Sequence, residues 1–223
     1  MHSSVNRLIL ITALSITPFT AWSYSFDVNV DTSNLSGTMA TLAFDFIDGD
    51  GAVNNTVQIS NFLPSGSYSS GPNTGDVSGS LSSTVFLGDN SLFINEFLQS
   101  ITLGNDLQFH IETSNLFNPS ALAPDSFAFF ILDSSASQPL FSTTDSIGAD
   151  ALFAIDLTGA NDGLHLFTTT SGSSWTLQPS GVSVPTPSPL LLLVVGIWCA
   201  YMSRKRTLSD KKAYFQQHRF VNL

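Results

Sequence analysis

Three acidic side chains in the first quarter of the chain are the first candidates for chemistry. Asp45, Asp48 and Asp50 stand close together in the sequence. Gly49 lies between Asp48 and Asp50, and Gly51 follows Asp50. Calcium binds to carboxylate oxygens of this kind when a tight turn gathers them. The spacing differs from that of an EF-hand loop, and Asp and Gly are also the residues that turns need. We therefore favour a solvated hairpin turn, keep a calcium site as the alternative, and expect no other cofactor.

Two histidines, His110 and His165, are the candidates for acid–base chemistry in the middle of the chain. A Ser-His-Asp triad needs only one histidine, but a triad is defined by a geometry that this sequence does not signal. His110 lies between Gln108 and Glu112 on the polar side of an alternating segment, and His165 follows an Asn-Asp-Gly turn. We expect both to be ordinary surface histidines, and we expect no catalytic residues and no enzyme.

The distribution of charge excludes several classes of function. The seven basic residues lie near the ends, and no Lys or Arg occurs between Leu8 and Ser203. Sixteen of the 17 acidic residues fall inside that interval. Nucleic-acid binding, a phosphate-binding Walker loop and a lysine nucleophile all need cationic side chains, so the middle region cannot supply them. The single cysteine, Cys199, lies in a late apolar run, so the middle region also has no disulfide.

The two ends have the composition of sorting signals. Residues 1–23 predict a secretory signal peptide: Arg7 precedes a short apolar run, and Ala21-Trp22-Ser23 fits the small-x-small rule for cleavage. Residues 179–189 form a Pro- and Ser-rich linker, residues 190–203 an apolar segment, and residues 204–223 a basic tail. We expect export, with residues 190–203 held in the membrane as a short transmembrane helix and the tail on the cytoplasmic side.

One part of this C-terminal pattern resembles a known family of signals. Pro185-Thr186-Pro187, the apolar run and Arg204-Lys205-Arg206 look like the PEP-CTERM sorting signal of Gram-negative bacteria. The resemblance implies recognition by an exosortase-like enzyme in the membrane and cleavage near the proline motif. Thr186 stands where that family has Glu, and residues 207–223 continue beyond the point where the family usually stops.

The middle region also resembles a family of PEP-CTERM extracellular proteins. The matching segments are 26–38, 57–62, 75–81 and 95–99, in that order. The family has no activity that can be carried over to individual residues. The resemblance implies placement at the cell surface or in the extracellular matrix.

Alternation with a period of two residues predicts the fold. Apolar and polar residues alternate in many segments between residues 24 and 178, as in strands with one buried and one solvated face. This predicts one all-β domain over residues 24–178, an antiparallel sandwich or jelly-roll-like domain of eight to ten strands. Residues 127–132 are apolar on both faces, which predicts a central strand buried on both sides. We expect a turn at residues 70–73, and residues 90–100 are the one segment that favours a helical turn.

These inferences predict a non-enzymatic, exported bacterial protein of the cell surface or extracellular matrix. One alternative is a carbohydrate-binding or carbohydrate-active sandwich, in which Trp175 or Tyr68 would stack on the sugars of a polysaccharide. For Trp175, a place in the core or at a sheet edge is the favoured interpretation. A second alternative is a single-pass membrane-anchored protein that is never processed.

Overall fold

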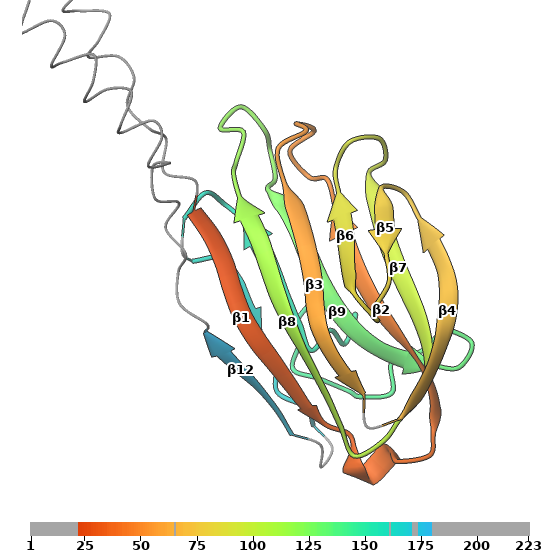
Figure 1. Cartoon of the computed structure of the whole chain (residues 1–223). Coiled ribbons are helices and arrows are strands. Elements are labelled where there is room, and N and C mark those ends of the chain that lie inside the picture. The colour runs from red at the N-terminus through yellow and green to blue at the C-terminus, as the bar shows by residue number, and fades with distance from the viewer. Residues whose placement is uncertain (1–21, 65, 161, 171–173, 180–223) are drawn as a thin grey trace, which may run out of the picture. The chain divides into compact units, whose positions relative to one another are not determined.

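The computed structural model describes residues 22–64, 66–160, 162–170 and 174–179, all within one compact unit, Thr20–Val184. These residues form two antiparallel sheets that lie face to face (Figure 1). The strands are β1 (Trp22–Asp31), β2 (Met39–Ile47), β3 (Thr56–Pro64), β4 (Ser67–Thr74), β5 (Val77–Gly79), β6 (Thr84–Gly88), β7 (Ile94–Thr102), β8 (Asp106–Asn115), β9 (Asp125–Asp133), β10 (Phe153–Leu157), β11 (Leu164–Leu166) and β12 (Trp175–Pro179). One short 3-10 helix, η1 (Ser33–Leu35), connects β1 to β2.

The strand order shows how the chain folds back on itself. The first sheet has the order β12-β1-β8-β3-β6-β5, and the second has the order β11-β10-β9-β2-β7-β4. β1 pairs with β8, β2 with β7 and β3 with β6, so each of the first three strands lies beside a strand from later in the chain. Two antiparallel sheets packed face to face make a β-sandwich-like fold. The prediction of an all-β domain built from antiparallel sheets is confirmed.

Phenylalanine side chains fill the space between the sheets. Phe44, at the centre of β2, is fully buried, and its ring centroid lies 4.8 Å from that of Phe129 on the adjacent strand β9. Phe109 of the opposite sheet approaches the same ring edge-on at 5.5 Å. A fully buried side chain of this size contributes about 1.5–3 kcal/mol to folding. Because the described part of the chain holds no cysteine, its stability depends on this packing and not on disulfides.

Two local predictions were wrong. Residues 94–102 form strand β7, and the expected helical turn is absent there; Asn95 is buried in this strand, where its Oδ1 accepts the Asp76 N–H (2.8 Å). Residues 70–73 lie inside the edge strand β4, at an irregularity in its pairing with β7. A Cβ on Gly71 would lie 2.1 Å from the Leu98 carbonyl oxygen, so glycine is needed for the close approach of the two backbones.

The prediction for residues 127–132 was correct in part. β9 lies inside the second sheet, between β10 and β2, as a central strand should. Phe127, Phe129 and Ile131 are buried in the core. The alternate residues Ala128, Phe130 and Leu132 are only half-buried on the outer face. The strand is therefore central, but it is fully buried on one side only.

The first two residues of strand β1 belong to the expected signal peptide, residues 1–23. β1 begins at Trp22, and Tyr24 is tied to the far side of the domain, because its hydroxyl donates to the Ala160 carbonyl (3.0 Å) and accepts the Gly163 N–H (3.0 Å). Residues 1–21 of the expected signal peptide and the expected segments 180–189, 190–203 and 204–223 lie outside the described residues. Within the described ranges, no helix has the length and hydropathy needed to span a bilayer.

Candidate metal centre

Three loops meet at one end of the sandwich, the upper end in Figure 1. They are residues 48–55 between β2 and β3, residues 89–93 between β6 and β7, and residues 116–124 between β8 and β9. Carboxylates tie these loops together: Asp50 Oδ2 accepts the Asn118 N–H (2.7 Å), and Asp89 Oδ2 accepts the N–H groups of Asn54 (3.0 Å) and Asn55 (2.8 Å). Backbone donors that no strand satisfies are therefore paired with acidic side chains.

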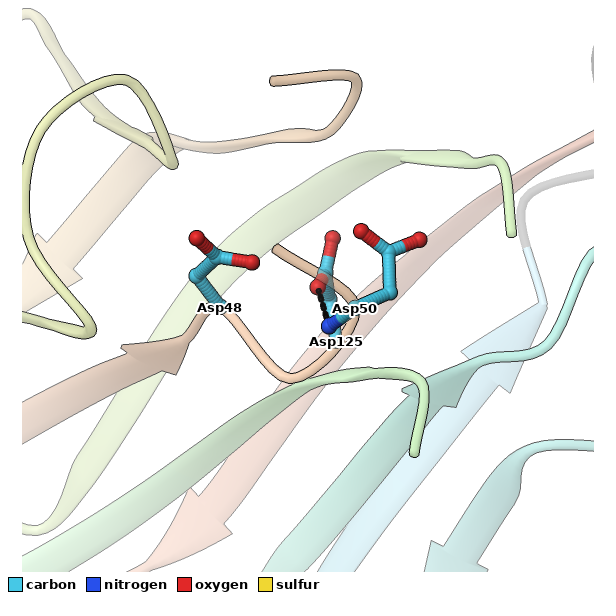
Figure 2. Close-up of side chains that lie close together, drawn as sticks. All are labelled: Asp48, Asp50 and Asp125. Atoms are coloured by element: carbon cyan, nitrogen blue, oxygen red, sulfur yellow. Dashed lines mark hydrogen bonds between the residues drawn. The ribbon is translucent and has the colours of Figure 1, made fainter. Parts of the chain in front are cut away.

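An acidic cluster, formed by Asp48, Asp50 and Asp125, lies where these loops join the second sheet (Figure 2). One carboxylate oxygen from each residue lies within 4.8 Å of the others. Asp50 and Asp125 are buried, and Asp48 is half-buried. In the described part of the chain the only side chains that can carry positive charge are those of the two histidines, and each of them pairs with a different aspartate. Three negative groups therefore stand together without a basic partner.

Asp125, the first residue of β9, is the centre of this network. Its Oδ1 accepts the backbone N–H groups of Gly49 (2.9 Å) and Asp50 (3.1 Å), the second of which is drawn in Figure 2. Its Oδ2 accepts a hydrogen bond from the Asn55 side-chain amide (2.7 Å). Burial raises the pKa of Asp125, the carboxylate of Asp50 raises it further, and the three hydrogen bonds oppose that shift. The carboxyl group thus holds the loop in place, although burial and the neighbouring carboxylate disfavour its ionised form.

A further oxygen beside the cluster has no donor. The Asn54 side-chain amide donates to Asp50 Oδ2 (3.2 Å), and Asn54 Oδ1 is sealed from solvent without a hydrogen-bond partner. Buried acceptors are nearly always paired, so an unpaired one calls for a missing donor, a water molecule or a cation. Carboxylate and carboxamide oxygens are the ligands that calcium prefers, and the chemistry of this donor set fits calcium better than zinc.

The sequence-based candidates separate in the structure. Asp48 and Asp50 come together, and Asp45 lies elsewhere, on the outer face of β2 and directly opposite Glu96 of β7. The sequence pattern missed Asp125, which is 75 positions from Asp50 and reaches the loop because β9 pairs with β2. Only that pairing identifies it, since Asp125 looks in the sequence like an ordinary polar residue at the start of an apolar strand.

No family model, curated protein or solved structure matched this chain in comparison searches. The two aromatic candidates for sugar stacking both make contacts within the domain, and Tyr68 remains 37% exposed. Trp175 packs on Phe153 at 5.9 Å and donates from its indole nitrogen to the Phe167 carbonyl (2.9 Å), as expected for a sheet-edge tryptophan. Tyr68 packs edge-on against Phe62 at 5.5 Å.

Proposed function

We propose that this chain is an exported bacterial protein of the cell surface or extracellular matrix, and that its principal role is positional. One observation carries the proposal: the sandwich is a self-contained body whose described residues include no Lys, Arg or Cys. Such a body neither binds polyanions nor depends on disulfide formation, and its uniform negative charge keeps copies of it apart. These are useful properties for a protein displayed outside the cell.

The proposed route to the surface uses the two ends of the chain. Residues 1–23 direct export, residues 190–203 hold the chain in the membrane, and Arg204, Lys205 and Arg206 keep the tail in the cytoplasm. An exosortase-like enzyme then cuts near Pro185-Thr186-Pro187. Mass spectrometry of the protein isolated from its native host tests this route. A mature chain that ends near residue 187 supports it, and a chain intact to Leu223 shows instead an unprocessed single-pass anchor.

We further propose that the acidic cluster binds calcium, so that the displayed domain is rigid where calcium is present. Three carboxylates and the unpaired Asn54 Oδ1 support this proposal, because a cation would relieve their repulsion and satisfy the oxygen at the same time. Thermal melting of the purified protein with and without millimolar calcium is the test. Calcium that binds only the folded state stabilises it by RT ln(1 + [Ca²⁺]/Kd). The melting temperature should therefore rise once the calcium concentration exceeds the dissociation constant.

Matched variants separate a specific site from general screening of charge. Asp48→Asn and Asp133→Asn each remove one negative charge, but Asp133 accepts hydrogen bonds only in its own turn, away from the cluster. A calcium-dependent rise in melting temperature that is lost in Asp48→Asn and kept in Asp133→Asn supports the site. An equal rise in both variants, or none in the unmodified protein, removes calcium from the proposal.

Carbohydrate binding is the second candidate, and it is favoured by the outer face of the first sheet. Phe86 of β6 is 44% exposed there, and its cross-strand neighbours in register are Gln58 and Ser78. An exposed ring beside carboxamide and hydroxyl groups suits the apolar face and the hydroxyls of a sugar. A glycan array tests it: binding that Phe86→Ala abolishes, and that the loop variant Phe93→Ala retains, supports this function. An array with no binding removes it.

A further inference from the structure

Three polar residues come together on the outer face of the first sheet. Ser25 and Asp27 of β1 flank the buried Phe26, so both side chains point away from the core. His110 of β8 stands directly opposite Asp27 in the register of the two strands. The pairing of β1 with β8 thus brings together side chains that lie 83 and 85 positions apart in the chain.

The two ring nitrogens of His110 have different partners. Nδ1 lies 2.8 Å from Asp27 Oδ1, and Nε2 lies 3.3 Å from Ser25 Oγ. An ionised carboxylate only accepts hydrogen bonds, so Nδ1 carries the ring proton of the neutral imidazole. Nε2 is then left with its lone pair facing the serine hydroxyl, which becomes the donor. This is the order of contacts in a Ser-His-Asp triad: the carboxylate orients the histidine, and the histidine accepts the proton of the serine.

The surroundings define which substrates could reach these residues. Ser25 is half-buried, the His110 side chain is 20% exposed, and the Asp27 side chain is 63% exposed, so the group is open to large molecules. The neighbouring outward positions in register carry Glu112, Ser60 and Gln178. With no Lys or Arg among the described residues, this face offers nothing to hold an anionic substrate. A neutral ester on a polyhydroxylated polymer fits it better.

We propose that Ser25, His110 and Asp27 form a hydrolytic triad for neutral esters. Ser25 Oγ attacks the ester carbonyl carbon while its proton passes to His110 Nε2. The carbon–oxygen bond to the alcohol then breaks, and the same proton leaves with the alcohol. Water next attacks the acyl-serine and gives a proton to His110, which returns it to Ser25 Oγ as the carboxylic acid departs. This activity goes beyond the positional role proposed above, and it revises the expectation of a non-enzyme, because the structure supplies the geometry that the sequence does not signal.

Covalent labelling of the full-length protein, purified in detergent, tests the nucleophile directly. A fluorophosphonate should phosphonylate Ser25 Oγ with loss of fluoride, and peptide mass spectrometry locates the modified residue. Labelling should disappear in His110→Gln and fall at least tenfold in Asp27→Asn. His165→Gln is the matched histidine control, since His165 Nε2 also meets an aspartate, Asp156 Oδ2, at 3.1 Å, but on the other sheet. Ser78→Ala is the serine control, because Ser78 lies at the far edge of the same sheet face as Ser25. Both controls should keep full labelling of Ser25.

Hydrolysis of p-nitrophenyl acetate gives a second, independent readout. General-base activation of a nucleophile contributes roughly 10²–10⁴-fold, so the unmodified protein should exceed Ser25→Ala by at least tenfold. Circular dichroism of each variant confirms that the sandwich is folded, and Ser25→Cys, which keeps a nucleophile at the same place, should still be acylated. The proposal is overturned if Ser25 labels no faster than other surface serines, or if Ser25→Ala hydrolyses the ester at the unmodified rate.

Discussion

Replacement of Asp45 by Asn should stabilise the protein at alkaline pH and have little effect in mild acid. Asp45 lies on the outer face of β2, directly opposite Glu96 of β7, and its Oδ1 is sealed from solvent without a hydrogen-bond partner. Burial raises the pKa of Asp45 to about 7, and the nearby carboxylate of Glu96 raises it in the same direction. Like charges directly opposite each other in a sheet are destabilising, so the ionised pair is unfavourable.

The direction in which the free energy of unfolding changes with pH follows from proton binding. Between about pH 4 and pH 7 the folded protein holds a proton on Asp45 that the unfolded chain has lost, so the free energy of unfolding falls as the pH rises. A shift from 3.8 to about 7 corresponds to roughly 4 kcal/mol at 1.36 kcal/mol per pH unit. Because the side chain is only half-buried, solvent screening reduces this to about 2 kcal/mol. For a domain of this size the melting temperature should change by about 4–8 °C.

Differential scanning fluorimetry at pH 4 and pH 8 measures the effect. Asp45→Asn should melt about 4–8 °C above the unmodified protein at pH 8 and within about 2 °C of it at pH 4, where the unfolded chain has only begun to lose the proton. Glu96→Gln should act in the same direction but less strongly, because Asp45 remains buried. Glu112→Gln, in β8 on the other sheet, is the control, because the cross-strand neighbours of Glu112 are the uncharged Ser25 and Gln58; it should give no such difference between the two pH values. An equal gain in Asp45→Asn at both pH values would refute the titration argument.

Three further predictions concern packing and the loop network. Phe44→Ala should lower the free energy of unfolding by about 3–5 kcal/mol in urea titration, since Phe44 packs against both sheets; the exposed Phe93→Ala should cost less than about 1 kcal/mol. Asp125→Ala should cost about 3 kcal/mol, because it leaves two backbone N–H groups without their acceptor and removes one of the two acceptors of the Asn55 amide; unchanged hydrogen exchange in residues 48–55 would contradict this role. Gly71→Ala should destabilise the edge strand β4. Gly88→Ala should be tolerated, because its Cβ would lie 3.0 Å from the end of the Asn90 side chain and at an ordinary 3.9 Å from the Asp76 Cβ; melting curves compare the two.

Alternation predicted the strands wherever one face is buried. In β8, Leu107, Phe109 and Ile111 face the core as the pattern requires. The pattern failed in β4, whose sequence of Ser, Gly, Pro and Asn is typical of a turn. β4 is a strand because β7 offers it an edge to pair with, and pairing across 20 or more residues leaves no local signal.

The candidate sites were less predictable than the fold for a related reason. Asp48 and Asp50 are neighbours in the chain, so composition alone brought them to notice. Asp125 belongs to the same cluster only through the pairing of β9 with β2, and Ser25 meets His110 only through the pairing of β1 with β8. A periodic pattern shows which face of a strand a residue occupies, but not which strand lies beside it. Sites that span two strands therefore become visible only when the strand order is known.

No Lys or Arg occurs among the described residues, so most of their acidic side chains are satisfied by backbone and hydroxyl donors, and this determines how the fold responds to pH. Asp133 accepts the backbone N–H of Ser137 (2.9 Å), and this bond lowers the pKa of Asp133; hydrogen bonds from Ser33 likewise lower the pKa of Asp31. Carboxyl groups of this kind stabilise the fold above about pH 4, and their contribution disappears as the pH falls through their lowered pKa values. Asp45 and Asp125, whose pKa values are raised, act in the opposite sense and destabilise the fold as the pH rises. The two sets together place the maximum of stability at about pH 4, where the first set is ionised and the loss of stability caused by Asp45 has only begun.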